Sequence, residues 1–379
     1  MSKQYHPPTG AQPVLSAWAK ATVGEFSEMI AAVPKECANI MSVKAEMLRE
    51  LSERLRYIKE LEKFDPRELT EVVLKKDYKC VEEIRGHNDD VWGLQMLSDG
   101  RMVSGDFDGT IHIWSHDADS RWQSEELKGH SNLINCLQVL PDKRIVSGGA
   151  DGFLRILSRG ADGAWQSEVL QGHGGKINCF QVLPDRRIVS GSEDGILRIL
   201  SCNADGRWRS EALKGHIGDV KCLQVLPDER IVSGGEDGTI RIWSRDAYSK
   251  WQSEVLEGYS GAVWCLQALP DGRIVSGSLD GLCIRSRDVD GKWPSEVLRG
   301  HGGIVMCLQV LPDERIVSGG DDKTLRIWSR DEDGKWQSEV HRHRSVVRCL
   351  QVLSDGRIFS GDRAGVLRIW DGIPVEDML

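Results

Sequence analysis

Three side chains that could form a hydrolytic triad lie close together in one stretch of the sequence. His301, Ser318 and Asp322 fall within GHGGIVMCLQVLPDERIVSGGDDKTLRIW, residues 300–328. A serine that a histidine activates, with an aspartate orienting the histidine, is the arrangement of serine hydrolases. Such chemistry needs one singular constellation, so it matters whether the stretch occurs once.

The stretch recurs along the chain. Seven copies align on the position of His301, and the steps between them are 43 residues four times and then 42 residues twice. The aligned residues are His87, His130, His173, His216, Tyr259, His301 and His343. Seven copies at a nearly fixed period predict a repeat architecture. Because these copies are degenerate and an enzyme needs one site, we expect a protein that is not an enzyme.

The composition is typical of a soluble globular protein whose acidic excess lies in the repeats. Of the 379 residues, 40% are hydrophobic and 28% are charged, and the formal charge is -9. Residues 1–77 hold twelve basic and twelve acidic residues, so the whole excess belongs to the repeats. An acidic repeat region disfavours nucleic acid or an anionic membrane as the main partner. No apolar run approaches the ~18 residues of a membrane span, so we expect no membrane insertion.

Six cysteines hold the same place in successive repeats, two residues before a glutamine. They are Cys136, Cys179, Cys222, Cys265, Cys307 and Cys349. Equivalent positions in different repeats cannot all pair with one another, so we interpret them as small buried hydrophobes rather than disulfides or metal ligands. Reduced thiols, together with an N-terminus that lacks the apolar core of a secretory signal, predict a cytoplasmic protein. We expect neither a metal nor a cofactor, because no zinc-ligand spacing or phosphate loop is present.

One repeat, residues 215–258, predicts four short antiparallel strands. DVKCLQVLP alternates in polarity, ERIVSGG and TIRIWS flank the tight turn EDG, and WQSEVLEG alternates again. Four strands in about 43 residues, repeated along the chain, are typical of a β-propeller. A single four-stranded sheet cannot bury both faces, whereas sheets stacked around an axis can.

The repeated Gly-His pair, the turn aspartate and the Ile-Trp that ends the third strand resemble the WD-repeat β-propellers over residues 78–371. The resemblance implies a mostly β fold, a seven-bladed propeller. The last copy ends at Trp370, and the tail 372–379 is too short and acidic for a convincing fourth strand. Residues 78–85 alternate like a strand and have no third strand before them, so we expect them to complete the last blade.

The resemblance also implies a structural role for the apparent triad. In the family, a network within each blade links the tryptophan, the serine, the histidine and the turn aspartate. Carried over to blades one, four and six, its members are His87, Ser104, Asp108, Trp114, His216, Ser233, Asp237, Trp243, His301, Ser318, Asp322 and Trp328. Leu157 and Leu200 replace the tryptophan in blades two and three, Tyr259 replaces the histidine in blade five, and Ala364 replaces the aspartate in blade seven. We expect incomplete networks in these four blades, with blade five the most irregular.

Residues 1–77 lack the repeat and predict helices over 13–33 and 36–64, with a further helix from Pro66. Leu48, Leu51 and Leu55 belong to an apolar seam of about two heptads, short of a coiled coil. We favour helices that pack on each other or on the propeller side, and hence a monomer, over self-association. The segment is also a candidate partner-binding module.

Family resemblance places partner-binding residues at three positions per blade on one face of the propeller. Here these positions vary while the framework barely changes. The candidates are Asp90, Trp92, Phe107, Asn135, Lys176, Asn178, Asp219, Lys221, Trp264, Leu279, Met306, Asp321, Arg348 and Arg363. Trp, Arg and Met are enriched at interfaces. Trp92 with Phe107, and Trp264 with Leu279, are expected to be exposed anchors, and Arg348 with Arg363 a basic corner.

The sequence therefore predicts a non-enzymatic scaffold or adaptor that binds a protein or peptide on this face. Three alternatives stay open. One is a substrate-recognition subunit of a larger complex, such as a ubiquitin-ligase or signalling assembly. Another is a bacterial effector acting on host proteins in the host cytoplasm. A third is a reader of methylated amines, with Trp92 or Trp264 in an aromatic cage.

Overall fold

The computed structural model describes residues 76–374, except residues 98, 172, 184, 204, 227, 270, 312 and 354. The helices expected within residues 1–75 and most of the expected tail lie outside the described residues. The described part consists of strands, turns and loops, and no helix in it has the length and apolar character of a membrane span.

Seven four-stranded antiparallel sheets make up the described part of the chain. In each sheet we name the strands a to d from the innermost outward. The first four sheets contain β2 (Val91–Met96), β3 (Met102–Asp106), β4 (Thr110–His116), β5 (Trp122–Lys128); β6 (Ile134–Val139), β7 (Ile145–Gly149), β8 (Phe153–Arg159), β9 (Trp165–Gln171); β10 (Ile177–Val182), β11 (Ile188–Ser192), β12 (Ile196–Cys202), β13 (Trp208–Lys214); and β14 (Val220–Val225), β15 (Ile231–Gly235), β16 (Ile240–Arg245), β17 (Trp251–Leu256). The last three contain β18 (Cys265–Ala268), β19 (Ile274–Ser278), β20 (Gly281–Arg285), β21 (Ser295–Leu298); β22 (Val305–Val310), β23 (Ile316–Gly320), β24 (Thr324–Arg330), β25 (Trp336–Arg342); and β26 (Val347–Val352), β27 (Ile358–Asp362), β28 (Val366–Pro374), β1 (Lys76–Arg85).

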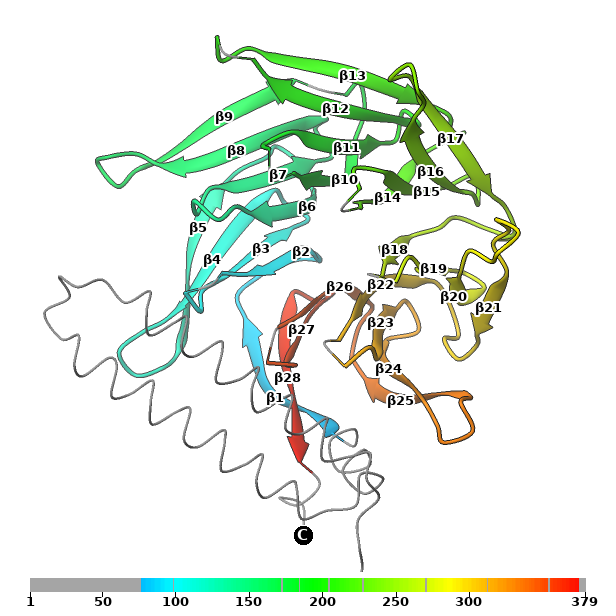
Figure 1. The fold of residues 1–379 in the computed structure, drawn as a ribbon. Helices are drawn as coiled ribbons and strands as arrows, with labels where there is room; N and C mark the ends of the chain where they lie inside the picture. Colours follow the sequence, from blue (N-terminus) through cyan, green and yellow to red (C-terminus); the bar gives the residue numbers. More distant parts are fainter. Residues whose placement is uncertain are drawn as a thin grey trace, which may run out of the picture. The chain divides into compact units, whose positions relative to one another are not determined.

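The sheets stand side by side in a ring, and Figure 1 shows their innermost strands around one centre. Each strand a contacts the strand a of both neighbouring sheets, and the contact of β2 with β26 closes the circle. The fold is a seven-bladed β-propeller, as expected.

The two ends of the described chain meet in the seventh blade. The sheet order there is β1-β28-β27-β26, so β1 from the N-terminal side forms the outermost strand beside β28 (Figure 1). Across this join, Arg368 Nε donates to Glu83 Oε1 at 3.0 Å. The strand β1 starts two residues before the expected boundary, and β28 runs on to Pro374 instead of ending at Trp370. Pairing β1 with β28 covers an edge that would otherwise be open.

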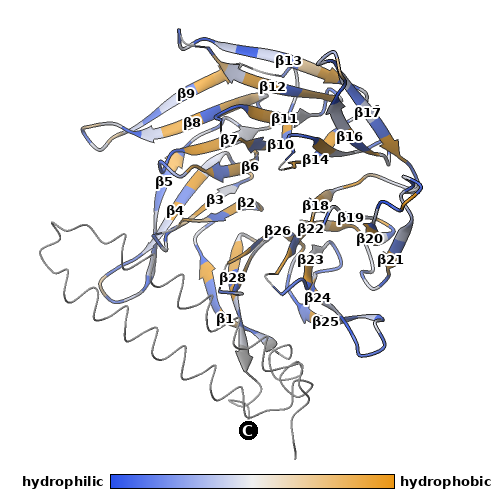
Figure 2. Ribbon diagram, viewed as in Figure 1, coloured by the Kyte–Doolittle hydropathy of each residue, from blue (hydrophilic) through white to orange (hydrophobic). Residues whose placement is uncertain are grey.

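The core lies between neighbouring blades. One cluster joins Met102 and Trp114 of blade one to Phe359 of blade seven, and another joins Val103 of blade one to Ile145 of blade two. Every strand b is buried along its whole length, which is why IVSGG-type runs are nearly continuous in small and apolar residues. Figure 2 shows apolar segments along these inner strands. Burial of both faces of each sheet is the main stabilising contribution expected for such stacking.

The repeat cysteines are packing residues of strand a. Cys136, Cys222 and Cys349 carry free thiols that are buried or half-buried, and burial raises the pKa of Cys349 to about 12. A thiol with a raised pKa is a poor nucleophile and a poor metal ligand.

Candidate protein-binding face

The residues that opened the sequence analysis form a buried chain of hydrogen bonds in blade six. His301 Nδ1 lies 3.0 Å from Asp322 Oδ2, His301 Nε2 lies 2.7 Å from Ser318 Oγ, and Trp328 Nε1 donates to Ser318 Oγ at 2.8 Å. Because the carboxylate only accepts, His301 Nδ1 carries the proton and Nε2 accepts from the serine hydroxyl. Ser318 is fully buried, so a substrate cannot reach its oxygen. The arrangement braces strands b and c against the loop before strand a.

Blade four repeats this geometry. His216 Nε2 lies 2.8 Å from Ser233 Oγ, His216 Nδ1 lies 3.1 Å from Asp237, and Trp243 Nε1 donates to Ser233 Oγ at 2.9 Å. Burial lowers the pKa of His216, and the charge of Asp237 opposes that shift. The imidazole is therefore neutral in the folded protein near pH 7.

Blades two and three keep the brace without its tryptophan. His130 Nε2 lies 2.8 Å from Ser147 Oγ and His130 Nδ1 lies 2.9 Å from Asp151. His173 makes the corresponding contacts with Ser190 at 2.8 Å and Asp194 at 3.3 Å. With leucine in place of tryptophan, the serine oxygen loses one donor, so these networks have three members.

The prediction that Asp108 belongs to the network of blade one is wrong. The partner of His87 Nδ1 is Asp106, at 2.8 Å, whereas Asp108 Oδ1 accepts from the backbone N–H of Thr110 at 3.1 Å. Burial raises the pKa of Asp106, but hydrogen bonds from His112 and His87 outweigh it and hold the pKa far below its ordinary value. His87 Nε2, Ser104 Oγ and Trp114 Nε1 complete the network as expected.

In blade seven, as in blade one, the carboxylate comes from the residue that ends strand b. Asp362, not a turn residue, lies against His343 and accepts from Arg368. In blades two and four this strand-end position is Gly149 or Gly235, where an added Cβ would collide with the histidine and the turn aspartate. The carboxylate therefore comes either from the turn, where the strand end is a small residue (glycine, or Ser192 in blade three), or from the strand end itself.

Blade five departs furthest from the pattern. Its strands β18 and β21 have four residues each, where the corresponding strands of the other described blades have six or more. The hydroxyl of Tyr259 contacts Ser276 Oγ in place of a histidine, and Arg285 Nη2 donates to the Glu257 carbonyl at 2.6 Å. Asp280 accepts from the backbone N–H of Ser260 at 2.8 Å instead of joining the network.

The expected partner-binding positions surround the turns between strands b and c. We name this edge of the sheets the top face. In six blades the residue before the turn there donates its N–H to the residue before strand a, as Phe107 does to Asp90 at 3.0 Å. In six blades the register of strand a shifts directly after its first residue, as between Val91 and Gly93. Trp92 and its counterparts in these six blades are thus bulge residues. A bulge re-aims a side chain, which explains why this position varies freely in a constant framework.

One group of candidates meets across blades one, six and seven, and we name it the arginine cluster. Arg348 lies over the ring of Trp92, 4.3 Å from its centroid, and its Nη2 donates to Asp90 at 3.4 Å. Arg363 approaches Asp90 at 3.7 Å, and Arg348 Nη1 lies 4.0 Å from the sulfur of Met306. Burial raises the pKa of Asp90 and lowers that of Arg348, while each opposes the shift of the other.

A second group meets across blades three, four and five, and we name it the lysine cluster. Lys221 Nζ lies 2.5 Å from Asp219 Oδ2 and 4.9 Å from the centroid of Trp264. Asn178 Nδ2 donates to the same carboxylate oxygen at 3.3 Å. Leu279, 58% exposed, belongs to the neighbouring turn of blade five.

Two of the expected exposed anchors are half-buried. The rings of Trp92 and Trp264 are covered in part by Arg348 and Lys221, whereas Phe107 and Leu279 are exposed as expected. Asp90 is buried rather than open to a partner. Because the two tryptophans contact different cations from different blades, the structure does not bring them into one aromatic cage.

The other candidates stay outside both clusters. Asn135 Nδ2 donates to the Ile177 carbonyl at 2.8 Å and so links blades two and three. Lys176 is exposed and pairs with Glu193 at 3.5 Å. Asp321 is half-buried on its turn.

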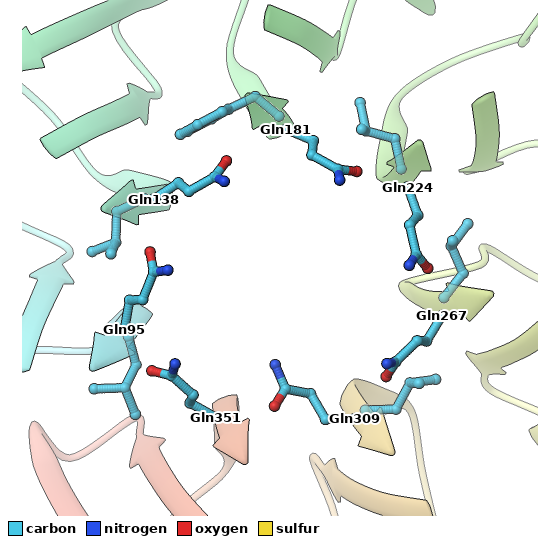
Figure 3. A pocket seen from close by; sticks show the side chains of 13 residues that line it. Gln95, Gln138, Gln181, Gln224, Gln267, Gln309 and Gln351 are labelled. Carbon is cyan, nitrogen blue, oxygen red and sulfur yellow. The ribbon is translucent and has the colours of Figure 1, made fainter. Parts of the chain in front are cut away.

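Sequence reasoning missed a ring of glutamines in the centre of the propeller. Each strand a contributes one, and Figure 3 shows all of them pointing toward the axis: Gln95, Gln138, Gln181, Gln224, Gln267, Gln309 and Gln351. In five of these, Oε1 accepts from a backbone N–H of the next blade at 2.5 to 2.8 Å, and Gln351 accepts from Met96 N–H. The sequence carries a signal for this ring, because a glutamine recurs at the same position of all seven repeats.

A buried cluster of His87, Asp106 and His112 is the described group whose spacing would suit a metal ion. Its atoms already have protein partners: His87 bonds Asp106 and Ser104, and His112 Nδ1 lies 3.4 Å from Ser124 Oγ. The ring of His112 also stacks on Trp114, with centroids 5.4 Å apart. The geometry is that of an extended brace in blade one.

Comparison with known proteins agrees with this geometry. The family description "WD domain, G-beta repeat" matches residues 78–115, 122–158, 165–201, 207–244, 251–284, 292–329 and 334–371. The chain belongs to the WD-repeat family. Among solved structures, the WD40 β-propeller domain of Doa1 is similar to this WD-repeat chain, with 25% identity and a TM-score of 0.66 over 79% of this chain and 98% of the Doa1 chain. No curated protein sequence matches the chain.

Proposed function

We propose that the chain is a non-enzymatic scaffold that binds a protein or peptide on its top face. WD-repeat propellers generally mediate protein–protein interactions, which supports this reading. The observation that carries it is the arginine cluster beside Phe107. It combines an aromatic ring, a thioether and one arginine at bulge positions with a second arginine on a turn, next to a phenylalanine that is 48% exposed.

The cluster has the chemistry of an interface hot spot. Trp and Arg are the residues whose removal most often costs binding energy, and they act best when partly buried and held in place. Arg348 holds the ring of Trp92 from one side, so little side-chain entropy remains to be lost on binding.

The lysine cluster offers a second anchor of different character. Ile217 and Leu279 are 80% and 58% exposed, and Trp264 lies in the same sector of blades four and five. A partner that reaches both clusters would contact exposed apolar side chains at each of them, Phe107 beside the arginine cluster and Ile217 with Leu279 beside the lysine cluster.

The buried networks support the proposal that the chain is not an enzyme. Every histidine–serine pair described above is enclosed within its blade, and the pKa of the histidine is lowered by burial. Such histidines hold the strands in register instead of activating a nucleophile.

Affinity capture with matched variants tests the proposal. The test variant carries Trp92→Ala, Phe107→Ala, Trp264→Ala and Leu279→Ala, and the control carries Val169→Ala and Val255→Ala on outer strands, where both valines are exposed. Partners retained by the wild-type protein and the control should be lost from the test variant. Equal melting temperatures of the two variants would show that both are folded. Retention of the same partners by the test variant would refute binding on the top face.

A further inference from the structure

The glutamine ring fixes which way its amides point. A carboxamide carries one acceptor oxygen and one donor NH₂, and the two ends are easily confused. Here a backbone N–H from the next blade can bond only the oxygen, as Val225 N–H bonds Gln181 Oε1 at 2.6 Å and Ala268 N–H bonds Gln224 Oε1 at 2.5 Å. The Nε2 groups of the linked glutamines are therefore the ends left over for the channel.

These Nε2 groups have no protein acceptor among the described residues and line an open cavity. The cavity holds about 390 Å³ and is lined by the seven glutamines together with leucines and one phenylalanine. No charged side chain is among its lining residues. Figure 3 shows the amide ends converging on the open centre from all sides.

Gln267 is the exception in the ring. Its Oε1 is buried without a hydrogen-bond partner among the described residues. It belongs to blade five, whose strand a is the short β18. The link from blade five to blade six is thus missing.

We propose that the channel binds a small oxyanion, of the phosphate or sulfate class, on the axis of the glutamine ring. An oxyanion accepts hydrogen bonds from all sides and donates few, which matches a ring of converging side-chain donors. Neutral donors held in place can stabilise an anion without a formal counter-charge, because their dipoles are already oriented. The volume leaves room for such an ion with some of its water.

The bulge residues of strand a also favour a negatively charged ligand. The bulge residue of strand a lies three positions before each glutamine, and it is Lys221 in blade four and Arg348 in blade seven. None of the six bulge residues is acidic, and neither is Trp264 at the same position of blade five. Asp90 of the adjacent blade pairs with Arg348, and Asp219 of the same blade pairs with Lys221, so the mouth is not strongly cationic and the amide ring supplies the specificity. The site is separate from the proposed partner-binding role and does not depend on it.

Substitution of glutamine by glutamate is informative because it keeps an acceptor oxygen and removes the NH₂ donor. In Gln181→Glu with Gln224→Glu, a carboxylate oxygen still accepts from Val225 and Ala268, but two donor groups are lost. The control Gln123→Glu with Gln252→Glu adds the same charge on exposed positions of outer strands. Full-length protein would be titrated calorimetrically with sulfate and with phosphate at constant ionic strength, with chloride as the reference salt.

Wild-type protein and the control should bind one oxyanion saturably, and the ring variant should bind at least about tenfold more weakly, since each donor lost removes a charge-assisted hydrogen bond. The phosphate and sulfate titrations decide which ion is preferred. A selenate-soaked crystal of the wild type gives a test that needs no variant, because an anomalous selenium peak should lie on the axis between the glutamines. The proposal is overturned by absence of saturable binding to the wild type, by equal binding to the ring variant, or by selenium peaks confined to the outer surface.

Discussion

Removing the serine at the centre of a network should destabilise blade six more than blade two. In Ser318→Ala, His301 Nε2 loses its donor at 2.7 Å and Trp328 Nε1 loses its acceptor at 2.8 Å, and both groups stay buried. Each unsatisfied buried polar group costs about 1–3 kcal/mol, so the loss should be about 2–6 kcal/mol. In Ser147→Ala the histidine alone loses a partner, because Leu157 stands in place of the tryptophan, and the loss should be about 1–3 kcal/mol.

Urea unfolding followed by circular dichroism measures this difference. Both variants remove the same hydroxyl from the same position of a buried strand b, so their transfer terms cancel in the comparison. The midpoint should fall further for Ser318→Ala than for Ser147→Ala, with similar slopes. Equal losses would show that the tryptophan bond contributes nothing, and an unchanged midpoint for both would refute the structural role of the network.

Two further predictions concern the charged members of the networks. Asp106→Asn should lower the free energy of unfolding by about 1–3 kcal/mol and Asp108→Asn by less, because Asp106 and not Asp108 bonds His87; a larger loss for Asp108→Asn in the same urea experiment would reverse the assignment. Mildly acidic pH should already destabilise the protein. Burial lowers the pKa of His87, His130, His173, His216, His301 and His343 in the folded state. The unfolded chain therefore takes up protons first as the pH falls through about 6.5, and stability is lost from there toward the folded-state pKa values. Urea midpoints should be flat above about pH 7.5 and should fall by pH 5, and a midpoint that does not change over this range would contradict buried neutral histidines.

The sequence predicted the propeller because every level of the pattern agrees. The period sets the blade, the alternation around CLQV sets strand a, and the unbroken IVSG runs match strands buried on both faces. The closing strand also followed from the sequence, since a lone alternating segment at 78–85 had a partner only at the other end of the repeats.

The details that sequence missed depend on three-dimensional exchange between positions. Asp106 and Asp362 replace a carboxylate that elsewhere comes from the turn, and nothing in one repeat shows that a strand-end residue can reach the histidine. The glutamine ring depends on neighbouring blades, because its acceptors bond an N–H about 44 positions away in sequence. The partial burial of Trp92 and Trp264 follows from cations of adjacent blades, which linear order does not pair.

Site-specific photo-crosslinking tests the central claim, binding on the top face, most directly. A photoreactive side chain would replace Phe107 or Leu279 on the top face, Val169 on an outer strand, or Tyr248 in the loop between β16 and β17. All four positions are exposed, so all can report a contact. Binding on the top face predicts covalent adducts with a captured partner from positions 107 and 279 and none from 169 or 248. Adducts from 169 or 248 without adducts from the top face would contradict it.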